Sequence, residues 1–151
     1  MFEKQPWMQR AGEYPQSDSE YFALLARAVF SAGLGPKVVE ARWKEMGNAF
    51  HGFDPAKVER MDETDVSRLL GDPAVIRNRR KIEAVIANAH RFLERAGESD
   101  SFHTYLTGMG AGSDLEAAAE GLAQTFTHLG RTSALFFLFS AGWRPQEVPE
   151  A

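Results

Sequence analysis

Hydrophobic and polar residues follow one another along this chain with the spacing of helices. Between Ile82 and Leu93, apolar side chains recur three or four positions apart and so fall on one face of a helix. Residues 18–32 show the same spacing, with Phe22 and Leu25 on one side. No stretch has the two-residue alternation of a convincing strand. The pattern predicts an all-α protein made of many short helices in one compact domain.

Residues that favour helix ends divide the chain into these segments. Asp18, Asp54 and Asp62 can each cap a helix, and Pro36 can occupy a first helical position. Ser113 and Glu116 have the spacing of a capping box. The expected helices cover about residues 18–32, 36–46, 54–61, 62–71, 76–96, 99–106, 113–128 and 131–141.

The 151 residues suit a single domain, 1–151, in which we expect residues 1–16 and 144–151 to be loosely ordered. The chain has no cysteine, which excludes disulfides, thiolate catalysis and cysteine-based zinc sites. No apolar run approaches the roughly 20 residues that span a bilayer. The first residues also lack the apolar core of a signal peptide. We expect a cytoplasmic protein with no membrane contact.

The formal net charge of −4 argues against nucleic-acid binding by bulk charge. Any contact with DNA would need a local patch.

A short turn with glycine, FTHLGRTSA at residues 126–134, joins two of the expected helices. Ordinary packing explains most such turns, but a helix-hairpin-helix element has the same form. Glycine at Gly130 permits backbone conformations closed to other residues. A helix that starts there points its free N–H groups and positive dipole end outward, which suits a phosphate. Arg131 adds a charge, and Thr132 and Ser133 add hydroxyl groups.

Two further segments allow both a structural and a DNA-binding interpretation. The string IRNRRK at residues 76–81 concentrates positive charge at a helix start, where the helix dipole disfavours it. Phosphate contact would explain the cluster, as would a solvated surface. The cluster consists of Arg77, Arg79, Arg80 and Lys81. The second segment, Ser31 to Gly35, is either a helix corner or a loop that presents Leu34 as an apolar wedge between bases.

The order and spacing of these strings resemble the DNA-3-methyladenine glycosylase I family, within the helix-hairpin-helix DNA glycosylase superfamily. The resemblance runs from about Asp18 to Trp143, through AGL, FHGFDPAKVERM, IRNRRKIEAVIANA and FTHLGRTSALFFLFSAGW. It implies an enzyme that flips alkylated purines such as 3-methyladenine out of duplex DNA and hydrolyses their N-glycosidic bond. Leu34 then matches the wedge, and Gly130, Arg131 and Thr132 match the phosphate-binding hairpin.

The chain departs from the pattern of this family at several places. The family's zinc site needs cysteines and histidines near the two ends, so we expect no metal here. The carboxylate that contacts the damaged base falls at Ala28, and the tryptophan after AGL falls at Pro36. Beyond the hairpin helix, where the superfamily has an aspartate, only Glu147 and Glu150 are acidic.

Other residues could take over these roles. Glu13, Glu20 and Glu40 are candidate carboxylates, although a solvated glutamate is the simpler interpretation of each. A ring-methylated base is already cationic and leaves without protonation, so loss of the carboxylate weakens the enzyme hypothesis without excluding it. The aromatic residues that could line a base pocket, with core packing the simpler interpretation for the last two, are Trp7, Tyr14, Phe30 and Trp43.

Three functional hypotheses follow. The first is a glycosylase that acts as a monomer on duplex DNA with a damaged base and needs no cofactor. The second is a catalytically degenerate, non-enzymatic protein that binds or senses damaged DNA. The third is an all-α interaction domain with no role on DNA.

Overall fold

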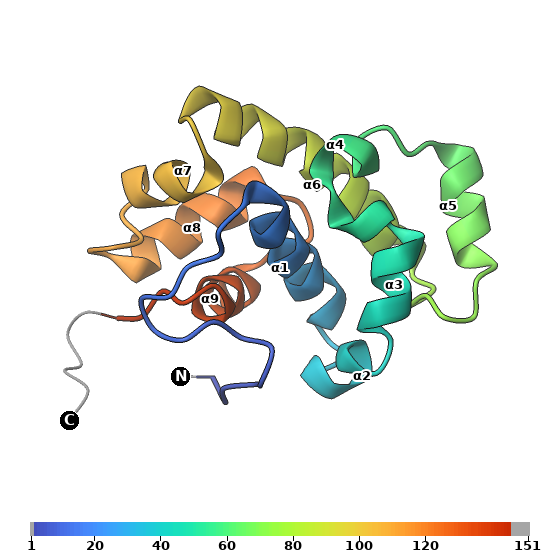
Figure 1. Ribbon diagram of the computed structural model, residues 1–151, viewed down its shortest axis with the longest axis horizontal. Coiled ribbons are helices and arrows are strands. Elements are labelled where there is room, and N and C mark those ends of the chain that lie inside the picture. The colour runs from blue at the N-terminus through green and yellow to red at the C-terminus, as the bar shows by residue number, and fades with distance from the viewer. Residues whose placement is uncertain (1, 146–151) are drawn as a thin grey trace.

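The computed structural model describes residues 2–145, and all the regular secondary structure in this range is helical, which confirms the predicted fold class. Figure 1 shows α1 in the centre, between a group formed by α7, α8 and α9 and a group formed by α2 to α5. The long helix α6 connects the two groups. The helices are α1 (Asp18–Ser31), α2 (Pro36–Glu40), α3 (Trp43–Ala49), α4 (Pro55–Val58), α5 (Glu63–Leu70), α6 (Arg79–Glu98), α7 (Phe102–Gly108), α8 (Leu115–Thr125) and α9 (Arg131–Ser140), with a 3₁₀ turn at His51–Phe53.

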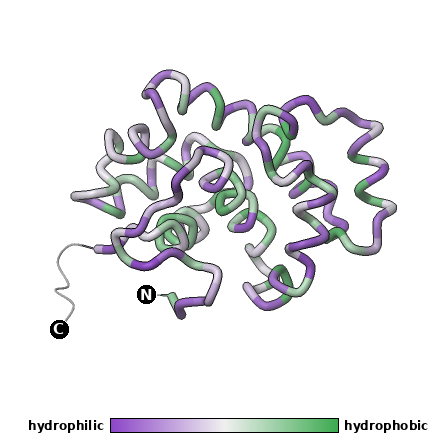
Figure 2. Tube along the Cα trace, in the orientation of Figure 1, coloured by the Kyte–Doolittle hydropathy of each residue, from purple (hydrophilic) through white to green (hydrophobic). Residues whose placement is uncertain are grey.

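The core forms where α1, α6, α7 and α9 meet. The rings of Phe92 and Phe102 stack with centroids 4.1 Å apart, and Phe22 meets Phe92 edge-on at 5.3 Å. Phe137 of α9 is also fully buried. Figure 2 shows the hydrophobic stretches of α1 and α9 in the interior of the trace. Across the described range, none of the helices combines the length and the apolar character that crossing a membrane requires.

Several helix ends differ from the predicted ones. The segment predicted as one helix over 36–46 forms two, α2 and α3, which Ala41 and Arg42 separate. Ser17, rather than Asp18, caps α1 in a capping box with Glu20. The Asp18 carboxylate instead accepts a hydrogen bond from the backbone N–H of Phe102, at 3.0 Å.

The remaining differences lie in the second half of the chain. Asn78 caps α6, which runs one residue past Gly97. Ser101, and not Ser99, precedes α7, while Asp114 rather than Ser113 caps α8. The α8 helix ends at Thr125, so residues 126–130 form a non-helical turn that leads to α9.

The N-terminal segment lies along α9 and is more closely packed than the loosely ordered segment that the sequence predicts. The backbone N–H of Gln9 donates to the carbonyl of Ser140, and that of Gly12 to the carbonyl of Gly142, both at 2.9 Å. Met8 is buried. Gly142 has φ +99°, and a Cβ there would lie 2.8 Å from a backbone oxygen of this segment. Glu147 and Glu150 lie outside the described residues.

Candidate functional site

The loop after α1 and the start of α9, both predicted to contact DNA, border one surface hollow. Its volume is about 330 Å³, within the usual range of small-molecule sites of about 300–1,000 Å³. A neighbouring hollow of about 310 Å³ shares part of this lining and extends to Leu34 and Val38. The first hollow is lined by Phe2, Ala28, Ser31, Ala32, Gly33, Gly35, Pro36, Thr132, Ser133 and Phe136.

The lining of this first hollow is mostly apolar, and its side chains carry no charge. Its polar side chains are the hydroxyls of Ser31, Thr132 and Ser133. The Ser31 hydroxyl already donates to the carbonyl of Arg27 at 2.7 Å, which leaves its lone pairs to accept. Ala28 contributes only a methyl group. The hollow can therefore stack and hydrogen-bond a planar ligand, but its lining supplies neither a carboxylate nor an imidazole.

Leu34 forms an exposed apolar tip beside these hollows. Its side chain is 42% exposed, and among the described residues only Val38 is another exposed large hydrophobic residue. Gly33 and Gly35, at φ +81° and +88°, adopt the left-handed conformations that turn the loop on either side of the tip. The backbone N–H groups of Leu34 and Gly35 both donate to the carbonyl of Ser31 at 3.0 Å. The tip is therefore an exposed apolar side chain on a loop that two backbone hydrogen bonds hold, and its role as a wedge stays a prediction.

The α9 helix begins with uncovered N–H groups, as the hairpin interpretation requires. Its first turn closes with a 2.8 Å bond from Ala134 to the carbonyl of Gly130, and no side chain caps it. The N–H groups of residues 131–133 therefore have no acceptor within the described part of the chain. The expected reason for Gly130 was wrong, because its φ of −75° is open to any residue. The left-handed residue of this turn is His128, with φ +53°.

A Cβ added to Gly130 would meet no atom within 4 Å. The space beside Gly130, next to the first turn of α9, is therefore open. Arg131 is not free in this structure, because its guanidinium forms an ion pair with Glu116 of α8.

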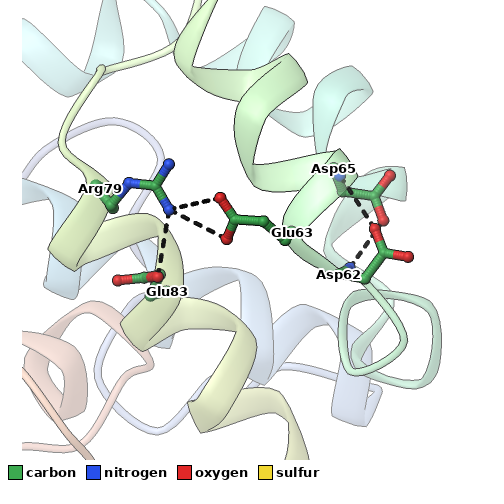
Figure 3. A network of polar contacts seen from close by, with 5 residues as sticks. All are labelled: Asp62, Glu63, Asp65, Arg79 and Glu83. Carbon is green, nitrogen blue, oxygen red and sulfur yellow. Dashed lines mark hydrogen bonds and ion pairs between the residues drawn. The ribbon is translucent and has the colours of Figure 1, made fainter.

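The basic cluster at the start of α6 divides into residues of three kinds. The Lys81 ammonium donates to the carbonyls of Phe30 and Ala32, at 2.9 and 2.5 Å, and burial lowers its pKa. Figure 3 shows the Arg79 guanidinium between Glu63 of α5 and Glu83 of α6, with nitrogen–oxygen distances of 3.0 and 3.5 Å.

Hydrogen bonding to Glu63 raises the pKa of Arg79. Arg77 and Arg80 are exposed and form no ion pair with another described residue. They are the two cations of the cluster available to a phosphate.

The same helix meets the connection that leads to the hairpin. Arg80, Thr127 and His128 line a third hollow, of about 370 Å³, so the basic cluster and the hairpin lie next to each other. Close by, the Asn88 amide donates to the carbonyl of Thr127 at 3.0 Å and accepts from its N–H at 2.9 Å. Asn88 is 1% exposed, and sequence reasoning missed it. Its signal was a polar residue on the apolar face of α6.

A buried arginine lies next to Ala28 in α1. Arg27 is 3% exposed, and its guanidinium forms an ion pair with Glu40 of α2. The guanidinium carbon lies 3.6 Å from the ring centre of Trp7 and 5.0 Å from that of Trp43. Burial lowers the pKa of Arg27, and the hydrogen bond to Glu40 opposes that shift. The Nε atom is buried without a partner. Sequence reasoning missed this residue as well, although it interrupts an apolar helix.

The four aromatic residues predicted for a base pocket lie elsewhere. Phe30 is fully buried against Phe50, while Trp7 and Trp43 flank Arg27. Tyr14 lies against Trp143 with the two rings tilted and their centroids 4.2 Å apart. The rings that line the first hollow, beside Ala28, are Phe2 and Phe136, which meet edge-on with centroids 5.5 Å apart.

The candidate carboxylates also lie outside the lining of the first hollow. Glu40 is held by Arg27. Glu13 is exposed on the N-terminal segment, and Glu20 belongs to the cap of α1. A catalytic role for Glu13 or Glu40 stays a prediction.

The residues around His103, where Tyr14 and Trp143 come together, do not fit the zinc site of the family that the chain resembles. His103 stacks near Tyr14 and Trp143, and its Nδ1 shares a 2.6 Å hydrogen bond with the hydroxyl of Tyr21. Burial raises the pKa of that hydroxyl. Within residues 2–145, histidine and acidic side chains form no group of three or more that could hold a metal ion.

Comparison with known proteins agrees with the arrangement of these elements. DNA-3-methyladenine glycosylase 1 of Escherichia coli K12 is 37% identical over 89 residues, which cover 58% of this chain and 48% of that protein. The chain thus spans about half the length of this relative. The 3-methyladenine DNA glycosylase I of Staphylococcus aureus superposes with a TM-score of 0.79 at 25% identity, over 93% of this chain and 87% of that one.

A variant of a 3-methyladenine DNA glycosylase I, solved in complex with 3-methyladenine, gives a TM-score of 0.80 at 23% identity, over 97% and 93% of the two chains. The family model for methyladenine glycosylase matches residues 7–136. That range holds the wedge loop, the basic cluster and the hairpin, so the chain belongs to the methyladenine glycosylase family.

Proposed function

We propose that this protein binds duplex DNA, turns a damaged base into the hollow beside Ala28 and hydrolyses the N-glycosidic bond of an alkylated purine. One observation carries this proposal. The hollow is bordered on one side by the Leu34 loop and on the other by the first turn of α9. An extrahelical base needs both a wedge that fills the vacated stack and a hold on its flanking phosphate. Membership of the family and the names of its relatives support the same substrate class.

A local phosphate-binding surface accounts for DNA binding by a chain with net charge −4. The free N–H groups and positive dipole end of α9 attract an anion without a basic side chain. Arg80 adds a free guanidinium group beside the hairpin, and Arg77 adds another exposed one just before α6. Exposed acidic side chains elsewhere do not cancel this attraction, because salt screens charges beyond about 8–10 Å.

The lining of the hollow favours a leaving base that carries its own positive charge. Such a base needs no general acid, since the electron pair of the broken bond neutralises it as it leaves. Water adds to the sugar carbon and loses a proton to solvent. The rings of Phe2 and Phe136 can stack on the base and attract its charge. The hydroxyls of Thr132 and Ser133 can accept hydrogen bonds from the base or from the attacking water.

A second candidate function is recognition of damaged DNA without hydrolysis. The observation that favours it is Ala28, which leaves the hollow without an ionisable lining side chain. General acid–base assistance contributes about 10²–10⁴ in rate. Without it, the scaffold would still bind an extrahelical base and hold the distorted duplex.

Incubation with methylated duplex DNA separates the two functions. The assay measures released methylpurines by chromatography and, in parallel, affinity for a duplex with a tetrahydrofuran abasic-site analogue. Release above the spontaneous rate, reduced in a Leu34→Ala variant, is the result expected of a glycosylase. Binding to the analogue without release would support the damage-recognition function. Failure to bind either duplex at low salt would contradict both candidate functions. The hypothesis of an interaction domain with no role on DNA would then remain.

A further inference from the structure

Two residues of α6 hold the two DNA-contacting loops, and neither needs to touch DNA. We propose that Lys81 and Asn88 are positioning residues, which set the distance between the Leu34 wedge and the phosphate-binding turn of α9. The inference rests on the proposed function, because it concerns how that site is held. It also reassigns Lys81, which the sequence predicts to contact phosphate.

Lys81 holds the base of the wedge loop. Its ammonium donates to the carbonyls of Phe30 and Ala32, at the C-terminal end of α1. Carbonyls at that end of a helix lack partners within the helix and favour a cation. Two of the three ammonium hydrogens are therefore engaged by the two residues that lead into Gly33 and Leu34. A phosphate could share only the third hydrogen unless Lys81 released the loop that carries the wedge.

Asn88 holds the start of the hairpin in a different way. It bonds both the N–H and the carbonyl of Thr127, as a neighbouring strand would. The amide is almost fully buried, so water cannot take over these bonds without local opening. Thr127 directly precedes His128, whose left-handed conformation turns the chain toward Gly130. The bonds of Asn88 thus fix the direction in which the hairpin reaches α9.

The two residues act from one rigid element. Seven positions separate Lys81 from Asn88, which corresponds to two turns, or about 10.5 Å along a helix. Both belong to the 20-residue helix α6. The side chains of Lys81 and Asn88 reach opposite borders of the DNA-contacting surface. The α6 helix therefore sets the distance between the wedge and the phosphate site. The distance between a flipped nucleotide and its flanking phosphate must match it.

Salt-dependent binding distinguishes positioning from phosphate contact. The test compares Lys81→Met with Arg80→Met, a matched control that removes the neighbouring free cation. Dissociation constants are measured by fluorescence anisotropy for an undamaged duplex and for one with a tetrahydrofuran abasic-site analogue, between 50 and 300 mM salt.

The two variants should differ in which measurement changes. Arg80→Met should reduce the salt slope by about 0.9 and weaken both duplexes alike. Lys81→Met should leave the salt slope and the undamaged duplex unchanged. Its preference for the abasic duplex should fall about tenfold, the equivalent of one lost hydrogen bond to a charged group.

A variant of Asn88 tests the other border. Asn88→Asp keeps the shape and the acceptor but loses the amide donor. We expect it to weaken both duplexes, because the phosphate site itself is displaced. Circular dichroism melting of each variant sets a common assay temperature at which all are folded. If Lys81 and Asn88 only stabilised the fold, the variants would melt at a lower temperature. The preference of the folded protein for the abasic duplex would then stay unchanged.

Three results would count against this inference. A salt slope that falls as much in Lys81→Met as in Arg80→Met would make Lys81 a phosphate contact. An unchanged abasic preference in Lys81→Met, or unchanged binding in Asn88→Asp, would remove the positioning role. If the unaltered protein bound neither duplex, the proposed function would fail first, and the inference with it.

Discussion

The ion pair between Arg131 and Glu116 should restrain DNA binding, and its removal should strengthen it. Both side chains are more than half exposed, at 59% and 52%, and Glu116 engages the cation that stands at the free N–H groups of α9. A phosphate at that turn must displace the Glu116 carboxylate from Arg131. The displaced carboxylate stays close and repels the phosphate. Glu116→Gln should therefore tighten binding to any duplex, whatever its sequence.

The size of this effect follows from the exposure of the pair. An exposed ion pair contributes about 0.2–1 kcal/mol, and two unit charges 4 Å apart in water interact by about 1 kcal/mol. Release of Arg131 should thus improve affinity by a factor of about 1.4 to 5 at 50 mM salt, and less at higher salt. If the freed guanidinium neutralises one more phosphate, the slope of log K against log salt steepens by up to about 0.9.

The assay is fluorescence anisotropy on one labelled duplex over a salt series, with Glu120→Gln as the control. Glu120 is an exposed residue on the same helix and forms no ion pair with another described residue, so its loss removes a charge without freeing a cation. Its salt slope should match that of the unaltered protein. Unchanged or weaker binding by Glu116→Gln, or an equal change of slope in both variants, would refute the phosphate role of Arg131.

Three further predictions concern stability, each measured by thermal and urea unfolding. Glu40→Gln should cost about 1–3 kcal/mol, because it leaves the buried Arg27 guanidinium without a charged partner, and adding Arg27→Met should recover part of the loss. Gly142→Ala should cost at least about 2 kcal/mol, since φ is +99° and its Cβ would lie within 3 Å of two backbone oxygens. Glu59 raises the pKa of His90, so protonation stabilises the fold fully below pH of about 6.5, and this contribution is lost as pH rises through the folded pKa. The stability advantage over His90→Gln should therefore be larger at pH 6 than at pH 8, and an advantage independent of pH would contradict the ion pair.

The helices themselves could be predicted from sequence because their signals are local. Asp54 and Asp62 cap the helices that follow them, as expected, and α9 has nearly its predicted bounds. Errors arose where neighbouring residues compete for one role. Ser17 and Asp18 are both good caps, and only the packing of α7 against α1 assigns Asp18 to Phe102.

The parts of the site that escaped prediction depend on partners far apart in the chain. The contact between Asn88 and Thr127 spans 39 residues, and that between Lys81 and Phe30 spans 51. Charge alone made the four cations 77–81 look equivalent. The fold gives them different partners: Lys81 binds carbonyls, Arg79 binds carboxylates, and Arg77 and Arg80 form no ion pair within the described part of the chain. Most of these partners are distant in the chain, so no local sequence pattern predicts them.

The docking of the N-terminal segment on α9 has a consequence for the order of folding. Gln9 and Gly12 take their acceptors from Ser140 and Gly142, more than 120 positions later in the chain. During synthesis on the ribosome, these bonds cannot form until α9 has emerged. Phe2 and Trp7, which belong to the same segment, cover the hollow and Arg27 only after that point. The recognition surface should consequently be completed late, so a stalled or truncated chain that lacks α9 would have no base-binding hollow.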